Sequence, residues 1–283
     1  MAAKARPLLN PDQTMYILPP LLLVIGGLGG FLSGLLGVGG GIIFVPALFF
    51  SMTALGTGPE QAMHLAVGTS LAVVFATGAT SALAHHRRGA VDSGIVRAWG
   101  AFIVGGVIFG SLFASSVDGR LLKEIFAVIT FAISLYMAFG SESKGPGAKT
   151  IAMNIQRGLC ACIGMVSSMI GVGGAILTVP MMSYIGVPMQ RAVGTGAALG
   201  MLISLPGCLG YMLGGAAQAY AAELPPFSVG YVNVLAALMI IPSSILLAPM
   251  GVKASHKLPR TTLRRVFAGV LMLVSIRMFM TLD

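Results

Sequence analysis

Apolar residues occur in this chain in long runs, without the two-residue alternation of a half-buried strand. Residues 95–114, apart from Arg97, and residues 125–139, for example, are apolar on every face. A helix that is apolar all round is buried in a large core or crosses a membrane, and crossing takes about 20 such residues. The pattern therefore predicts membrane-spanning helices. It argues against an outer-membrane barrel, whose strands alternate over segments of about ten residues.

The apolar runs form two series of five segments. The first series covers about residues 17–36, 42–55, 62–84, 95–116 and 121–139, and the second follows the same order. The third, fourth and fifth segments of each series are long enough to span. The second segments have only about 14 and about 11 residues, too few at 1.5 Å per residue to cross a core of about 30 Å. The first two segments of each series therefore predict a helical hairpin broken at glycines, which dips into the membrane or crosses it fully.

Both series contain the same glycine-rich motif. Residues 30–41 read GFLSGLLGVGGG and residues 164–175 read GMVSSMIGVGGA, 134 positions apart, and Val-Pro follows each motif. Residues 66–70 match residues 192–196 at an offset of 126, and residues 122–127 match residues 263–268. The chain is therefore an internal duplication, with the same order of helices in each half.

The duplication predicts the domain organisation: an N-terminal tail (1–15), a first transmembrane repeat (16–140), a linker (141–150) and a second repeat (151–283). Each repeat makes an odd number of net crossings, so the two repeats would have opposite orientations. In that arrangement twelve basic residues fall on the cytoplasmic side and four outside, whereas parallel repeats divide them about evenly. We therefore expect an all-α polytopic membrane protein of two inverted-topology repeats, each with a glycine-broken helical hairpin plus three spanning helices.

Composition and charge narrow the function classes. The chain is 56% apolar and 9% charged, with a mean hydropathy of +0.93, which excludes a water-soluble globular protein. The net charge of +9 would raise the question of nucleic acid in a soluble domain, but basic loops in a membrane protein set its orientation. The three cysteines lack metal-ligand spacing, and no pattern indicates a cofactor. We therefore expect membrane lipid to surround the protein, and we expect no nucleic acid to bind it.

The paired glycine motifs predict an anion site. If the two hairpins reach the membrane midplane from opposite faces, the N-termini of both short helices bring unpaired amides and positive dipole ends to one region. Glycine lets an anion approach the backbone, and nearby hydroxyls add donors without a buried charge. Close helix packing is the alternative reason for the glycines. The predicted substrate-binding residues are Ser33, Gly37, Gly39, Gly40, Gly41, Thr69, Ser70, Ser167, Gly171, Gly173, Gly174, Thr195 and Arg191.

Other polar residues suggest secondary roles. His64, which aligns with Gln190 of the second repeat, could carry a proton, or could be a hydrogen-bonded histidine at a helix end. Arg87 and Arg88 could form an inner vestibule that attracts anions, or could anchor the topology. Ser81 and His85, four residues apart on one helix, allow an intramembrane serine hydrolase, although no third orienting group accompanies them.

The motifs resemble those of the TauE/SafE family over about residues 17–280. They are Gly-x-Gly-Gly-Gly with Val-Pro (37–46), its degenerate copy (171–180), Gly68-Thr69-Ser70 and Arg87-Arg88-Gly89. Ala175 and Gly196 depart from the repeated pattern and suggest unequal contributions from the halves. The resemblance implies a secondary active exporter of a small sulfur-containing anion, such as sulfite or an organosulfonate, across the bacterial inner membrane. It also implies alternating access and coupling to protons.

Two alternatives and one question of assembly stay open at this stage. A non-transporting membrane sensor or assembly subunit would share the composition, but no soluble domain accompanies the apolar segments. An intramembrane hydrolase would need the Ser81 and His85 pair. Symmetric transporters occur as monomers or dimers, so a homodimer is compatible with the sequence.

Overall fold

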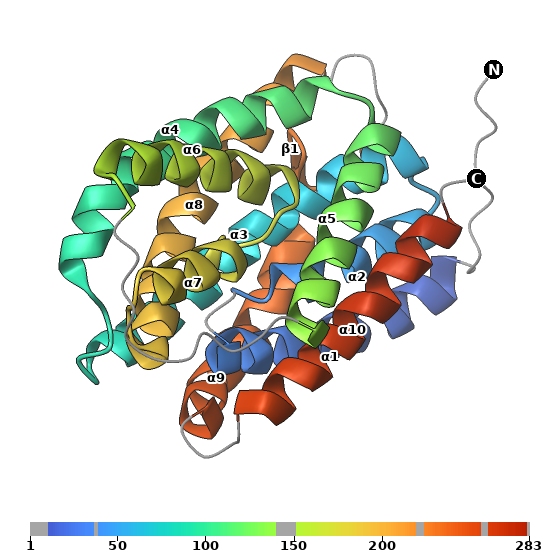
Figure 1. Ribbon diagram of the computed structural model, residues 1–283. Helices are drawn as coiled ribbons and strands as arrows, with labels where there is room; N and C mark the ends of the chain where they lie inside the picture. Colours follow the sequence, from blue (N-terminus) through green and yellow to red (C-terminus); the bar gives the residue numbers. More distant parts are fainter. Residues whose placement is uncertain (1–10, 37–38, 140–150, 219–223, 256–259, 282–283) are drawn as a thin grey trace.

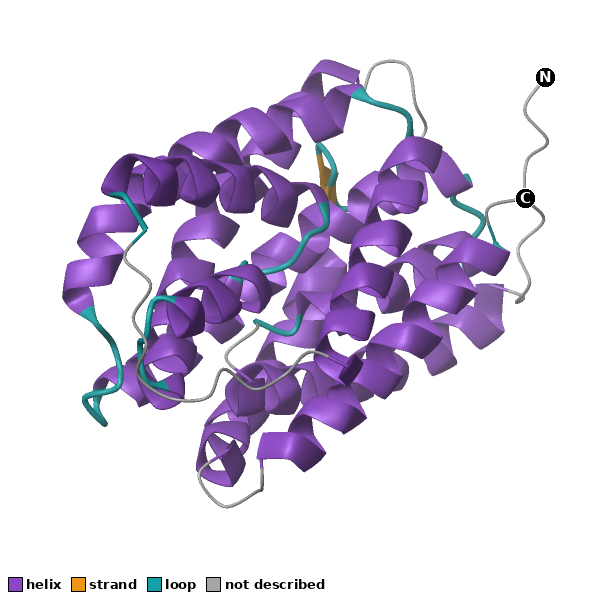
Figure 2. Ribbon diagram, in the orientation of Figure 1, coloured by secondary structure: helices purple, strands orange, loops and turns teal. Residues whose placement is uncertain are grey.

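The computed structural model describes residues 11–36, 39–139, 151–218, 224–255 and 260–281. Within these ranges the chain forms ten helices and one two-stranded hairpin (Figures 1 and 2). The helices are α1 (Pro11–Leu36), α2 (Gly41–Ala54), α3 (Pro59–His86), α4 (Ser93–Ser116), α5 (Gly119–Phe139), α6 (Met153–Met169), α7 (Ala175–Tyr184), α8 (Met189–Gln218), α9 (Val234–Ser255) and α10 (Arg260–Met280), and the strands are β1 (Ser228–Val229) and β2 (Val232–Asn233).

The helix lengths confirm an all-α membrane protein. In the described part of the chain, α3, α4, α5, α8 and α9 are long and apolar enough to cross a membrane. The helices after the two glycine motifs are short: α2 has 14 residues and α7 has 10, which is about 21 Å and 15 Å at 1.5 Å per residue. Neither can span alone. The two short segments and five of the six predicted spanning segments are therefore confirmed, whereas only Ala268–Met280 of α10 counts as an apolar helix, and it is shorter than a span. The opposite orientation of the repeats stays a prediction.

The structure differs from the expected boundaries at helix starts. Helix α1 begins at Pro11, so residues 11–15 of the expected tail are helical, and α3 begins at Pro59. Proline suits the first turn of a helix because its missing N–H needs no partner there. Residues 1–10 of the tail and the whole expected linker, 141–150, lie outside the described residues. The hairpin of β1 and β2 was not expected, because each strand has only two residues.

Helices of the two repeats pack against each other in reciprocal pairs. Helix α1 of the first repeat packs along α9 of the second, and α6 of the second packs along α4 of the first. The third helices of the repeats, α3 and α8, pack together at the centre of the molecule (Figure 1). The fifth helices, α5 and α10, pack together at one side. Equivalent elements thus make equivalent contacts, as a two-fold relation between the repeats requires.

Glycines allow the backbones of these pairs to touch. A Cβ on Gly34 of α1 would overlap the carbonyl oxygen of Ala248 on α9, and a Cβ on Gly106 of α4 would overlap that of Ala161 on α6. Helices in lipid gain little from the hydrophobic effect and associate through such close contact. Part of the glycine content is therefore explained by packing between the repeats.

Adjacent glycines on α4 test this explanation. A Cβ on Gly106 would lie 2.8 Å from the Ala161 carbonyl carbon, whereas a Cβ on Gly105 meets no atom within 4 Å. Both alanines gain the same helix propensity, so their difference isolates the overlap. We expect Gly106→Ala to destabilise the protein by about 1–3 kcal/mol relative to Gly105→Ala, measured as a lower thermal unfolding midpoint in detergent. Equal midpoints for the two variants would contradict the packing role.

Candidate functional site

The two glycine turns lie against each other between the repeats. Gly39 and Gly40 precede α2, and Gly171 and Gly174 precede α7; all four have positive φ, from +68° to +80°, which favours glycine. A Cβ on Gly39 would lie 3.5 Å from the Cα of Gly173, and a Cβ on Gly41 would overlap the Gly171 carbonyl oxygen. The structure therefore brings together the predicted glycines from the two repeats. Gly37 lies outside the described residues.

Both short helices start at this contact. The Gly40 carbonyl accepts from the amides of Ile43 and Phe44, and the Gly174 carbonyl accepts from those of Leu177 and Thr178. The first amides of an α-helix lack partners within the helix, and each N-terminus carries the equivalent of about half a positive charge. At the start of α7 the Ala175 amide donates to the Gly173 carbonyl oxygen of the turn at 2.8 Å. The meeting of two N-termini gives a region of positive potential without a cationic side chain. Among the side chains that the structure describes, Lys123 is the buried lysine, no arginine is buried, and the Lys123 Nζ lies elsewhere, 4.8 Å from the Phe49 ring centre.

Buried hydroxyls without described partners lie on the helices that the two turns connect. The side chains of Ser33 on α1, Ser167 on α6 and Thr178 on α7 are 0% exposed, and none has a hydrogen-bond partner within the described part of the chain. Ser33 and Ser167 occupy equivalent positions in the two repeats, 134 residues apart. The Ser167 Oγ lies 3.2 Å from the position of a Cβ on Gly174. Leaving a buried polar group unpaired costs about 1–3 kcal/mol, so such groups require an explanation.

Ser70 supports one of the turns directly. Its Oγ donates to the Gly171 carbonyl oxygen at 2.9 Å, from α3 of the first repeat to the turn of the second. The matched residue of the second repeat is Gly196, whose missing side chain lets α8 pack on Ala175 and Val179. The two departures from the repeated pattern, Gly196 and Ala175, are thus in contact with each other. The site is consequently asymmetric: at the matched positions the first repeat has a hydroxyl that binds the opposite turn, and the second repeat has a glycine that lets its own helices pack closely.

Thr69 and Thr195 bind backbone in this conformation. The Thr69 Oγ1 accepts from the Asn233 amide at 2.9 Å, and the Thr195 Oγ1 accepts from the Asp92 amide at 2.9 Å. The glycine before each of these threonines also contacts the opposite repeat: a Cβ on Gly68 would overlap the Tyr231 carbonyl oxygen. Likewise, a Cβ on Gly194 would overlap the Ala90 carbonyl oxygen. We call Gly68-Thr69 and Gly194-Thr195 the Gly-Thr clamps, since each holds the segment that precedes the fourth helix of the other repeat.

The clamped segments end in helix caps. The Asp92 Oδ1 accepts from the amides of Gly94 and Ile95 at 3.0 and 3.2 Å at the start of α4. The Asn233 Oδ1 accepts from the Ala236 amide at 2.9 Å at the start of α9. Neither Asp92 nor Asn233 is among the residues predicted from the sequence. The signal was present, because Val-Asp at 91–92 and Val-Asn at 232–233 are 141 residues apart, the offset of residues 122–127 and 263–268.

The predicted arginines lie outside the buried contact. Arg191 is exposed in the first turn of α8, so this conformation does not enclose it with the glycine turns. Arg87 and Arg88 are exposed at the end of α3, and the Arg88 Nη1 donates to the Val252 carbonyl oxygen near the end of α9 at 3.3 Å. Their roles in attracting an anion stay predictions. The contact of Arg88 instead joins the two repeats at one end of the bundle.

The remaining candidates lie on α3. His64 is buried beside the last turn of α4, with its ring nitrogens facing carbonyl oxygens. Ser81 and His85 are both buried, and the Ser81 Oγ has no hydrogen-bond partner among the described residues. The histidine therefore does not accept a proton from the serine here, and the geometry of an activated nucleophile is missing.

Comparison with known proteins places these features in a family. The profile described as "Sulfite exporter TauE/SafE" matches residues 22–278. A "Probable membrane transporter protein" of Haemophilus influenzae is 32% identical over 268 residues, which cover 94% of this chain and 100% of that protein. Proteins with similar names in Methanocaldococcus jannaschii and Bacillus subtilis (YunE) are 28% and 25% identical, covering 93% and 94% of their own lengths and 90% of this chain in both cases. No solved structure matches significantly.

The Gly-Thr clamps carry a stability prediction. Thr69→Val or Thr195→Val keeps the shape of the side chain but leaves a buried amide, that of Asn233 or Asp92, without its acceptor. We expect each valine to destabilise the protein by about 1–3 kcal/mol, seen as a lower thermal unfolding midpoint.

A matched control is available on the same helix. The Thr80 Oγ1 donates to the Ala76 carbonyl oxygen of its own helix at 3.0 Å, so Thr80→Val orphans no amide. Thr69→Ser retains the acceptor and should restore most of the loss. If Thr69→Val and Thr80→Val had the same unfolding midpoint, the clamps would have no structural role.

Proposed function

The chain belongs to the TauE/SafE family of membrane transporters, and from this premise we propose that it is a secondary active exporter of a small sulfur-containing anion. Sulfite or an organosulfonate fits the donors available. Transport would proceed across the bacterial inner membrane by alternating access and would be coupled to protons. No covalent chemistry on the substrate is required.

One observation carries this proposal. Two helix N-termini from different repeats meet at a buried glycine contact, and the Ser167 Oγ lies beside it without a partner among the described residues. Ser33, at the equivalent position of the first repeat, is also buried without a described partner. Amides and hydroxyls donate hydrogen bonds to sulfonyl oxygens, and the two dipoles together supply about one unit of positive charge. A small anion would accept hydrogen bonds from the unpaired hydroxyls and would be attracted by the positive potential of the helix N-termini.

The reciprocal contacts support an alternating mechanism. Helix α1 packs mainly on α9 and α6 packs mainly on α4, so each of the two units that would move against each other contains helices of both repeats. The glycine turns are buried and touch each other, so the conformation described here corresponds to a closed state of the proposed cycle. Separation of the turns toward one side or the other would admit the anion.

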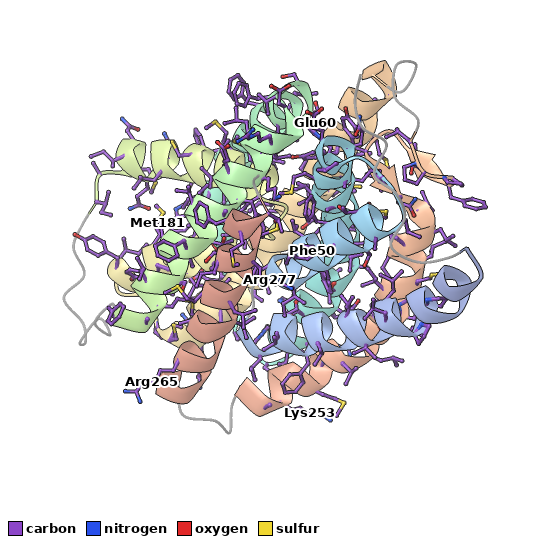
Figure 3. The ribbon with its side chains drawn as sticks, turned by 90° about the vertical axis from the view of Figure 1, so that its right-hand side faces the viewer. Phe50, Glu60, Met181, Lys253, Arg265 and Arg277 are labelled. Atoms are coloured by element: carbon purple, nitrogen blue, oxygen red, sulfur yellow. The ribbon has the colours of Figure 1, made fainter. Side chains whose placement is uncertain are left out.

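The charge distribution supports the proposed orientation. Lys253 and Arg265 lie at one end of the bundle and Glu60 lies at the opposite end (Figure 3). All three are exposed. Basic residues mark the cytoplasmic face, so the end with Lys253 and Arg265 would face the cytoplasm. An anion leaving the cytoplasm would then meet this basic end first.

The direct test is flux in proteoliposomes. Purified protein would be reconstituted, and release of radiolabelled sulfite would be followed with and without an imposed pH gradient. We expect gradient-dependent flux with the wild type. Absence of flux with sulfite, followed by absence of flux with a panel of organosulfonates, would reject the proposed substrate class.

Replacing the hydroxyls of Ser33 and Ser167 should lower transport without lowering the stability of the protein. Ser33→Ala with Ser167→Ala removes two buried groups that have no partner in the described structure, so we expect the unfolding midpoint to stay the same or rise. Transport should fall by about ten- to a hundredfold for each hydroxyl that binds the anion, because a hydrogen bond to a charged group contributes about 1.5–3 kcal/mol.

Ser275→Ala provides the control, because Ser275 is also buried but its Oγ donates to Met272 within α10. Flux through this variant should equal that of the wild type. Full transport in the Ser33 and Ser167 double variant would remove the hydroxyls from the anion site. Loss of transport together with a lower midpoint would indicate a structural role instead.

A further inference from the structure

The ring of His64 faces three carbonyl oxygens. The Nδ1 atom lies 2.9 Å from the Glu60 oxygen, one turn earlier on α3. The Nε2 atom lies 3.1 Å from the Ala114 oxygen and 3.0 Å from the Val117 oxygen, both at the end of α4. Carbonyl oxygens only accept hydrogen bonds, and a neutral imidazole has one N–H. Both nitrogens can donate only when the ring is an imidazolium, so this geometry fits the protonated histidine.

The surroundings of the ring stabilise a cation. Ala114 and Val117 belong to the last turn and the C-terminal cap of α4, where unpaired carbonyls form the negative end of the helix dipole. The opposite face of the junction is aromatic: the Tyr231 ring is stacked on His64, with centroids 4.6 Å apart and an interplanar angle of 25°. An aromatic face attracts a cation. The side chain is 5% exposed, so these contacts largely replace water.

Side-chain charges do not account for this position. The Glu60 side chain on α3 and the Asp118 side chain just before α5 are exposed. On α5, which packs on α3, Arg120 is also exposed and its Nε lies 3.4 Å from Glu124, while the Lys123 Nζ donates to the Thr281 carbonyl oxygen. The described residues of the hairpin segment, 224–233, include no charged side chain. Among the described residues, the polar and aromatic groups that contact the imidazole are therefore backbone carbonyls and the Tyr231 ring.

The ring also connects the two repeats. His64 and α4 belong to the first repeat, whereas Tyr231 lies in the turn between β1 and β2 of the second. The Tyr231 carbonyl packs on Gly68, and the Asn233 amide, two residues later, donates to Thr69. The imidazole and one Gly-Thr clamp thus hold the same hairpin. The matched residue of the second repeat, Gln190, is exposed and cannot bind a proton.

We propose that His64 is the proton-binding residue of the transport cycle and controls the junction of α3, the end of α4 and the hairpin. The protonated ring holds the junction closed. Loss of the Nε2 proton to water at this end of the bundle leaves a lone pair opposite the Ala114 and Val117 oxygens, and their repulsion opens the junction. Because only one repeat carries the histidine, the proton acts on one side of the membrane.

The protonation half of this inference is tested without transport. Nitrogen-15 spectra of the histidine rings would be recorded on the full chain in lipid nanodiscs at about pH 7.5, where a histidine in water is mostly neutral. The His64 signal is the one lost in His64→Gln. If that variant does not fold, replacing His85, His86 and His256 one at a time assigns it by elimination. Two protonated nitrogens are expected, and a neutral ring with one N–H would overturn the proposal.

The role of His64 in coupling transport to protons rests on the proposed function. It is tested in the same proteoliposomes that measure sulfite flux. His64→Gln should retain sulfite flux without a gradient but lose its stimulation by an imposed pH gradient by about tenfold, a typical coupling factor. His86→Gln, an exposed residue at the end of α3, should respond as the wild type does. Full stimulation in His64→Gln would overturn the coupling role. Absence of flux in the wild type would reject the substrate proposal and leave the protonation result to decide on its own.

Discussion

The contact between the two glycine turns is the constraint on which the rest of the structure depends. It places non-helical backbone between membrane helices, where amides and carbonyls need partners supplied by the protein. Positive φ values at Gly40 and Gly174 make the turns possible, and the absence of side chains at Gly39 and Gly41 lets them touch. The long helices α3 and α8 lie beside the turns, and Ser70 donates to Gly171 across the repeats. Irregular backbone is thus enclosed by the rest of the fold.

The same exchange between repeats occurs at the Gly-Thr clamps. Each clamp holds the segment that starts the fourth helix of the other repeat, and each segment is closed by a carboxylate or amide cap, Asp92 or Asn233. The third helix of one repeat therefore positions the fourth helix of the other. A movement of one repeat would be transmitted to the other through hydrogen bonds to backbone, which do not depend on the charge of any side chain. His64 adds a titratable contact to only one of these two junctions.

The buried hydroxyls fall into two groups, those with a hydrogen-bond partner and those without one in the described part of the chain. Thr69, Thr195 and Ser70 all have partners, and those partners are backbone groups of the opposite repeat. Ser33, Ser167 and Thr178 are equally buried but have no partner in the described part of the chain. In a medium that cannot supply hydrogen bonds, the first group stabilises the contacts between the repeats, and the second leaves polar groups unpaired within the described part of the chain. Buried hydroxyls of the two repeats thus differ in what they contact.

The sequence by itself determined the class of fold, because the length of an apolar run decides whether a helix can cross lipid. It also determined the duplication, the short helices after the glycine motifs and the membership of a transporter family. Only the tertiary structure decided which glycines touch, that Thr69 and Thr195 bind the backbone before α9 and α4, and that His64 faces the end of α4. These contacts join residues roughly 50 to more than 160 positions apart in the chain. Their partners are set by how the two repeats pack, which no local pattern of residues records.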